Sequence, residues 1–278
     1  MKPFDYFSPK SLSEASEVLS KYNGDAKMIA GGTDLLLKLK AGRLAPKAIV
    51  NIKHIPELRG ISSNPQSPIS IGALTTLEEI KRSPIIHENF PALSSAAATM
   101  ASVQIRNLAT VGGNMCNAAP SADLAPILIA LNATAVISGA KGERRVALED
   151  FFTGPGKSVL GVGELLVSVE VPKQESRSIY LKHSPREHMD IAVVGVGIAL
   201  QKNSVRIVLG AVAPIPLRAK KAEEEVMSGS LTKERIERAA KSAAEEAKPI
   251  DDVRGSVWYR RKMVEVMVRR GLMGLSGG

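Results

Sequence analysis

Two glycine pairs are the residues of this sequence best suited to holding an anion. Ala30 to Asp34 reads Ala-Gly-Gly-Thr-Asp, and Thr110 to Asn114 reads Thr-Val-Gly-Gly-Asn. Glycine lets the backbone turn sharply and lets its N–H groups approach an anion closely. We predict that each pair lies where a strand ends in a loop, and that a helix starting near Leu35 adds its positive end to the first. Such loops can hold a diphosphate, although a tight turn without a ligand explains either pair taken singly.

Other nucleotide and metal motifs are missing. No G-x-G-x-x-G opens a helix after a strand, which argues against a Rossmann dinucleotide site. Gly156-Lys157-Ser158 resembles the end of a P-loop, but Phe151 stands where a P-loop requires its first glycine. There is no H-E-x-x-H, and the four histidines have no recognisable metal-ligand spacing. The sequence therefore predicts neither a phosphate-binding ATPase nor a metal site.

Length and composition favour a folded cytoplasmic protein without a membrane span. The chain has 278 residues, enough for two domains, and its 44% apolar and 23% charged residues are ordinary values. Its most apolar stretch, Leu124 to Ile137, is interrupted and too short to cross a membrane, and no secretory signal is visible. The single cysteine, Cys116, cannot hold an iron–sulfur cluster alone, and we interpret it as a small buried hydrophobe.

The net charge of +9 does not indicate nucleic acid binding. The basic residues are interleaved with acids along the chain, and only 4% of the residues are aromatic. No helix-turn-helix, zinc-finger or aromatic RNA-binding motif accompanies them. A solvated basic surface, or one that faces an acidic partner subunit, is the simpler interpretation.

Helices and strands alternate in the first part of the chain. We expect helices at 12–19, 35–41, 91–101 and 121–131, and strands at 27–30, 48–52, 69–71, 134–138 and 165–171. Gly42 is suited to end the helix at 35–41, and Thr76 with Glu79 forms a capping box that opens a further helix. These elements predict a mixed domain over residues 1–172, with subdomains at about 1–55 and 56–172.

A polar stretch from Lys173 to Arg177 is the predicted linker to a second domain. Three strand-like segments follow at 178–182, 191–201 and 205–212, and then three helices at 220–228, 232–247 and 257–270. Strands followed by helices indicate an α+β domain, here over residues 178–278. The whole chain is therefore predicted to be a two-domain α+β protein.

Five ordered motifs resemble the FAD-binding subunits of molybdenum hydroxylases, the family of xanthine, carbon monoxide, aldehyde and N-heterocycle dehydrogenases. None would suffice singly, but the ordered set is highly specific and covers almost the whole chain. The segments are Met28 to Leu35, Arg106 to Asn114 with Pro120 to Asp123, Arg186 with Asp190 to Ala192, Ala213 to Ala219, and Asp252 to Ser256 with Tyr259 to Arg261. Phe151 to Lys157 and Asn117 to Asp123 look most like the xanthine dehydrogenase branch.

The resemblance implies a fold and a role in electron transfer. The fold would be a vanillyl-alcohol-oxidase-like, PCMH-type FAD domain of two subdomains, followed by a small α+β domain. This chain would hold FAD, take electrons from two [2Fe–2S] clusters on a small partner subunit, and pass them to an acceptor such as NAD. Substrate would be oxidised at a molybdopterin centre on a large partner subunit, so this chain would carry no catalytic residue. A cytoplasmic dimer of such heterotrimers is expected.

The resemblance also assigns FAD contacts. The two glycine segments would bind the diphosphate, mainly through backbone groups, and Asp123 would contact the polar chain of the flavin. The residues themselves also allow plainer readings, in which Asp123 caps a helix, Leu166 is strand core and Lys182 is a solvated charge at a strand edge. The residues implied to bind FAD are Met28, Ile29, Ala30, Gly31, Gly32, Thr33, Asp34, Leu35, Thr110, Val111, Gly112, Gly113, Asn114, Asp123, Leu166 and Lys182.

Three alternatives remain open at this point. A stand-alone flavoenzyme of the same fold, such as a UDP-sugar reductase or a small-alcohol oxidase, would need its own proton donor, for which the sequence offers no candidate. A scaffold that has lost FAD would not need intact glycine segments. Within the family, a carbon monoxide, aldehyde or N-heterocycle dehydrogenase subunit is the alternative to the xanthine branch.

Overall fold

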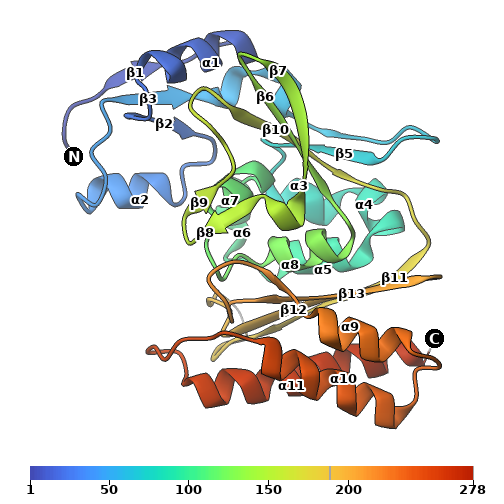
Figure 1. The fold of residues 1–278 in the computed structure, drawn as a ribbon. Coiled ribbons are helices and arrows are strands. Elements are labelled where there is room, and N and C mark those ends of the chain that lie inside the picture. Colours follow the sequence, from blue (N-terminus) through green and yellow to red (C-terminus); the bar gives the residue numbers. More distant parts are fainter. Residues whose placement is uncertain (188, 278) are drawn as a thin grey trace.

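The computed structural model describes residues 1–187 and 189–277 and has the predicted α+β fold. The structure has three units: a small β/α unit lies beside a central unit, and a C-terminal sheet with helices beneath it lies below the central unit (Figure 1). Over the described ranges, no helix is both long enough and apolar enough to cross a membrane.

The first unit is a three-stranded parallel sheet with one helix after each of its first two strands. The strand order is β1-β3-β2, which leaves β2 at an edge. Gly42 has a φ of 68° and donates its N–H to the Leu39 carbonyl, which confirms the predicted helix end. The elements are β1 (Asp5–Phe7), α1 (Leu12–Lys21), β2 (Ala26–Ile29), α2 (Leu35–Lys40) and β3 (Ala48–Asn51).

The central unit is a five-stranded antiparallel sheet with helices packed against one face. The strand order is β4-β5-β10-β6-β7, and a two-stranded hairpin, β8-β9, stands apart. The strands are β4 (Ile61–Ser62), β5 (Ile69–Gly72), β6 (Thr134–Gly139), β7 (Gly142–Ala147), β8 (Phe152–Gly154), β9 (Lys157–Ser158) and β10 (Leu165–Val171). The helices are α3 (Leu77–Arg82), α4 (Pro84–Asn89), α5 (Pro91–Ala98), α6 (Val103–Arg106), α7 (Val111–Asn117) and α8 (Leu124–Ala130), with 3₁₀ turns at 52–54, 56–58 and 148–150.

Several predicted boundaries in this unit need correction. The capping box of Thr76 and Glu79 is present as predicted. However, the helix expected at 91–101 ends at Ala98, and the one expected at 121–131 begins at Leu124. The sequence also missed β7, because its mostly exposed residues carry charges in place of an alternating apolar face.

The C-terminal unit is a four-stranded antiparallel sheet covered on one face by three helices. Its first strand begins at Ser176, so the last two residues of the predicted linker belong to a strand. Its second strand begins at Val194, three residues later than predicted, and its last helix continues to Ser276. The elements are β11 (Ser176–His183), β12 (Val194–Gln201), β13 (Ser204–Gly210), β14 (Leu217–Arg218), α9 (Lys220–Met227), α10 (Lys233–Glu246) and α11 (Val257–Ser276).

Close packing fixes the central unit on the C-terminal sheet. In Figure 1, α5 and α8 lie above β12 and β13, while α9, α10 and α11 lie below them. A Cβ added to Gly197 would lie 2.7 Å from the backbone carbonyl of Pro126, so only glycine permits this approach. Glu149 of the central unit also pairs with Arg206 and Arg218 of the C-terminal sheet, at 2.8 and 3.0 Å. The two units therefore present a fixed arrangement of side chains at their boundary.

Candidate functional site

The first glycine segment packs directly against the residues that precede the second segment. A Cβ added to Gly31 would lie 2.0 Å from the carbonyl oxygen of Leu108, so no other residue fits there without a shift of the backbone. Leu108 stands two residues before Thr110, where the second segment begins. The structure thus brings together two motifs that are far apart in the sequence.

The first segment has the predicted form. It follows β2, turns through Gly32 with a φ of 79°, and leads into α2. Within the described ranges, the backbone N–H groups of Gly31, Gly32, Thr33 and Asp34 donate to no protein acceptor. Unpaired backbone N–H groups just before a helix start are suited to bind a negatively charged group.

The second segment is not a loop after a strand, and that prediction was wrong. Residues 111–117 form α7, and Thr110 is its N-cap, whose side chain accepts a hydrogen bond from the Gly113 N–H at 3.0 Å. The preceding element is helix α6, and Thr110 takes part only in an isolated bridge with Thr76.

Acceptors from elsewhere in the chain hold the first turn of α7. Val111 donates its N–H to the Thr75 carbonyl, and Gly112 donates to the Ala73 carbonyl. Together with the Thr110 cap, these bonds occupy the N–H groups that a helix start leaves free. The second segment therefore has fewer backbone donors to offer a ligand than the first.

The two glycines of the second segment have different surroundings. A Cβ added to Gly112 would lie 2.6 Å from the Cβ of Ala73, so packing requires this glycine. A Cβ added to Gly113 would meet only the Thr110 Oγ1, at 3.0 Å. Apart from this cap oxygen, no atom within 4 Å fills the space beside Gly113, which leaves room for a ligand.

The side-chain carbonyl oxygen of Asn114 is a buried hydrogen-bond acceptor that receives no hydrogen bond. Its Oδ1 is shielded from solvent and has no hydrogen-bond partner in the part of the chain that the structure describes. Leaving such an atom unpaired costs about 1–3 kcal/mol. Diphosphate oxygens only accept, so they cannot satisfy Oδ1, whereas the ribityl and ribose hydroxyls of FAD are donors. The residues present thus fit FAD, with donors on one segment and an acceptor on the other.

Asp123 and Lys182 form a buried ion pair that joins the central unit to β11. The Lys182 Nζ lies 3.0 Å from the Asp123 Oδ2, and both side chains are less than one-tenth exposed. Tyr180 donates its hydroxyl to the Asp123 Oδ1 at 2.7 Å, and Lys182 also donates to the Thr99 carbonyl at 3.4 Å. In the described chain, Asp123 makes no side-chain cap bond to α8, so its interpretation as a helix cap is wrong. The Lys182 side chain is buried in an ion pair, so its interpretation as a solvated charge is also wrong.

Tyr180 is a member of this cluster that the sequence analysis missed. It lies two residues before Lys182 on one strand, which places both side chains on the same face of the sheet. Burial raises the pKa of its hydroxyl well above the ordinary value, so Tyr180 remains a hydrogen-bond donor to Asp123. The signal in the sequence was this spacing of two, which identifies a shared face but not the partner Asp123, just before α8.

Leu166 belongs to the packed interior, and the half-buried Cys116 lies against it. The Leu166 side chain is 4% exposed on β10 and lies in the hydrophobic core. Cys116 packs against the same core, and burial raises the pKa of its thiol to about 12. Cys116 therefore stays protonated at neutral pH, which agrees with its interpretation as a small hydrophobe.

Motif arginines hold loops in place. Buried Arg106 pairs with Glu78 at 3.0 Å and donates to three carbonyls between residues 98 and 101. Buried Arg260 pairs with Asp252 at 2.6 Å and donates to the carbonyl of Val193. The second and fifth motifs thus include residues whose observed contacts are structural.

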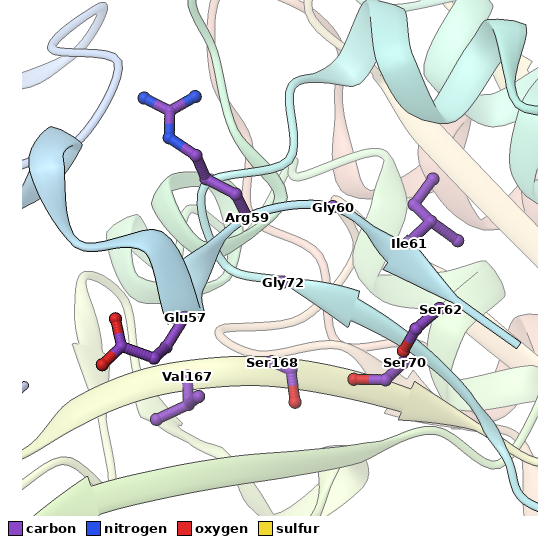
Figure 2. Close-up of a pocket in the computed structure, with 9 residues that line it drawn as sticks. All are labelled: Glu57, Arg59, Gly60, Ile61, Ser62, Ser70, Gly72, Val167 and Ser168. Carbon is purple, nitrogen blue, oxygen red and sulfur yellow. The ribbon is translucent and has the colours of Figure 1, made fainter.

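Two open pockets lie away from the glycine segments. One, of about 250 Å³, lies where β4, β5 and β10 meet, and Figure 2 shows Arg59 pointing away from Ser70 and Ser168. The other, of about 650 Å³, lies between α1 and the end of β6. Neither is lined by a residue predicted to bind FAD. Across the described residues, no three histidine, cysteine, aspartate or glutamate side chains gather in a way that could hold a metal ion.

Comparison with known families identifies the class of protein. Residues 2–174 match the FAD-binding domain in molybdopterin dehydrogenase, and residues 179–275 match the C-terminal domain of the carbon monoxide dehydrogenase flavoprotein. The chain belongs to this family: it is a FAD-binding subunit of the molybdenum hydroxylases, which are oxidoreductases.

Individual relatives cover nearly the whole chain. The carbon monoxide dehydrogenase medium chain of Hydrogenophaga pseudoflava is 34% identical, over 97% of this chain and 96% of that protein. A putative xanthine dehydrogenase FAD-binding subunit of Escherichia coli is 33% identical, over 95% and 93%. A structure of the H. pseudoflava carbon monoxide dehydrogenase that lacks the Mo-pyranopterin moiety matches with a TM-score of 0.94 at 34% identity, covering 98% of both chains. These identities are too similar to separate the branches of the family.

Proposed function

We propose that this chain is the FAD-carrying electron-transfer subunit of a xanthine dehydrogenase-like molybdenum hydroxylase in the cytoplasm. Its partners would be a molybdopterin-binding large subunit and a small subunit with two [2Fe–2S] clusters, in a dimer of heterotrimers. Bound FAD accepts single electrons and delivers a hydride equivalent, so it would link the clusters to an acceptor such as NAD. We also propose domain boundaries at 1–172 and 178–278.

The observation that carries this proposal is the complementary polarity of the two glycine segments. The free N–H groups of Gly31 to Asp34 would hold the diphosphate, and the buried Asn114 Oδ1 would accept a hydroxyl of FAD. Gly113 would leave room for the cofactor between them. The other contacts proposed from the resemblance are Met28, Ile29, Ala30, Leu35, Thr110, Val111, Gly112, Asp123, Leu166 and Lys182.

Exposed apolar side chains support a role within a complex. Val253 is fully exposed, and Trp258 at the start of α11 is 73% exposed. Ile250, just before them, is 70% exposed. Three apolar side chains this exposed within one short stretch of the chain favour a protein–protein contact over free solvent. A partner that covers this end of the C-terminal unit would remove them from water.

Anaerobic substrate titration tests the branch. With the native complex, we expect xanthine to bleach the flavin absorbance faster than carbon monoxide, an aldehyde or quinoline, and NAD to restore the absorbance afterwards. The large subunit would select the substrate, and the flavin on this chain would lose its absorbance when it receives the electrons. Bleaching by carbon monoxide or an aldehyde, with none by xanthine, would assign the chain to that branch instead.

A further inference from the structure

A hydrogen bond between Lys38 and Asn117 crosses from the first unit to the central unit beside the glycine segments. The Lys38 Nζ donates to the Asn117 Oδ1 at 2.7 Å, and both side chains are half-buried. Lys38 lies on α2, which the first segment opens, and Asn117 ends α7, which the second segment opens. This bond therefore ties together the two helices that present the motifs.

Helix geometry places the bond one turn beyond both motifs. Residues three or four apart share a helix face, and one turn advances about 5.4 Å along the axis. Asn117 is four residues after Gly113 and three after Asn114, so its side chain continues the same face of α7. Lys38 is four residues after Asp34, with the same relation to the first segment. The ammonium is therefore close to the residues that the FAD diphosphate would contact.

Lys38 differs from Arg106 and Lys182 in having no acidic partner. Glu78 neutralises Arg106, and Asp123 neutralises Lys182. In the described chain, Lys38 makes no ion pair, and its partner, Asn117, is a neutral amide. An amide oriented by its helix can hold an ammonium in place without cancelling its charge, which leaves that charge available to an anion.

We propose that Lys38 is a further FAD-binding residue, whose ammonium is the counter-charge of the diphosphate and is held in position by Asn117. This inference rests on the proposed function, because it presupposes that FAD lies between the two segments. It adds a side-chain cation to a cradle that otherwise consists of backbone N–H groups and the Asn114 amide. Lys38 is not among the residues that the family resemblance assigned.

FAD binding to the purified full chain tests the inference, with the apoprotein titrated with FAD at several salt concentrations. Lys38→Met keeps the apolar stem and removes the charge, and should weaken FAD binding about 10- to 100-fold. Lys38→Arg should restore most of the affinity. Lys40→Met is the matched control, because Lys40 is exposed and lies two residues further on α2, away from this face. It should leave the affinity unchanged.

The salt dependence of FAD binding shows whether Lys38 acts as a counter-charge or only links the two helices. Added salt should weaken FAD binding to the wild type and to Asn117→Ala, which keeps the charge, but should affect Lys38→Met much less. Equal salt dependence in Lys38→Met and the wild type would overturn the inference, as would equal affinities of Lys38→Met and Lys40→Met. If the wild type itself fails to bind FAD, the proposed function falls and takes this inference with it.

Discussion

Replacing Gly113 by valine is expected to lower the affinity for FAD by about a hundredfold or more, while the chain stays folded. A Cβ at Gly113 meets only the Oγ1 of its own helix cap, Thr110, at 3.0 Å, and no other atom within 4 Å. A branched side chain would fill the space that the cofactor must approach. Flavin fluorescence titration gives the affinity, and circular dichroism gives the fraction of folded protein.

Gly112 provides the matched control for Gly113. A methyl group at Gly112 would collide with Ala73, so Gly112→Ala should destabilise the fold by about 1–3 kcal/mol, as overpacking does. Its FAD affinity per folded molecule should fall much less than that of Gly113→Val, because the added methyl group points at Ala73. If instead Gly113→Val unfolds while its affinity per folded molecule is unchanged, Gly113 serves the turn alone.

Lys182→Met should lower the free energy of unfolding by roughly 3–5 kcal/mol, because it leaves the buried Asp123 carboxylate without its cation. Burial already raises the pKa of Asp123, and Lys182 is the main charge that opposes this rise. Urea denaturation at neutral pH measures the change, since the carboxyl group is expected to be ionised in the unfolded chain.

A double variant checks that the loss comes from the ion pair. Lys182→Met combined with Asp123→Asn removes both charges, so it should be more stable than Lys182→Met alone. A fall in FAD affinity without any loss of stability in Lys182→Met would contradict a role in joining the two units. It would instead support a direct contact between Lys182 and the cofactor.

The sequence predicted many of the helices and strands in their order, because local signals dominate those elements. Ser11, Thr76 and Gly42 sit at helix ends where their side chains or backbone geometry are needed. The helix at α7 was missed because Val-Gly-Gly-Asn has a low helix propensity. It forms because the carbonyls of Ala73 and Thr75, from a distant part of the chain, supply the acceptors for its first turn.

The site could be located from the sequence, but the roles of its residues could not be separated. Gly112 and Gly113 are the same residue type in the sequence. Only the structure shows that Gly112 packs against Ala73, whereas Gly113 has free space beside it. The bond between Lys38 and Asn117 spans 79 residues, and the one between Tyr180 and Asp123 spans 57. No local pattern encodes such pairs, because they depend on how the three units pack.

The most direct test of the proposed function is the composition of the complex recovered from native extract. The chain should be pulled down at moderate salt, its partners identified by mass spectrometry, and its metals measured. We predict a molybdopterin-binding subunit and a small iron–sulfur subunit in equal amounts with this chain, together with molybdenum, iron and FAD. A stable contact with such partners would bury on the order of 1,000 Å² or more. Recovery only as a free monomer that oxidises a substrate unaided would contradict the account.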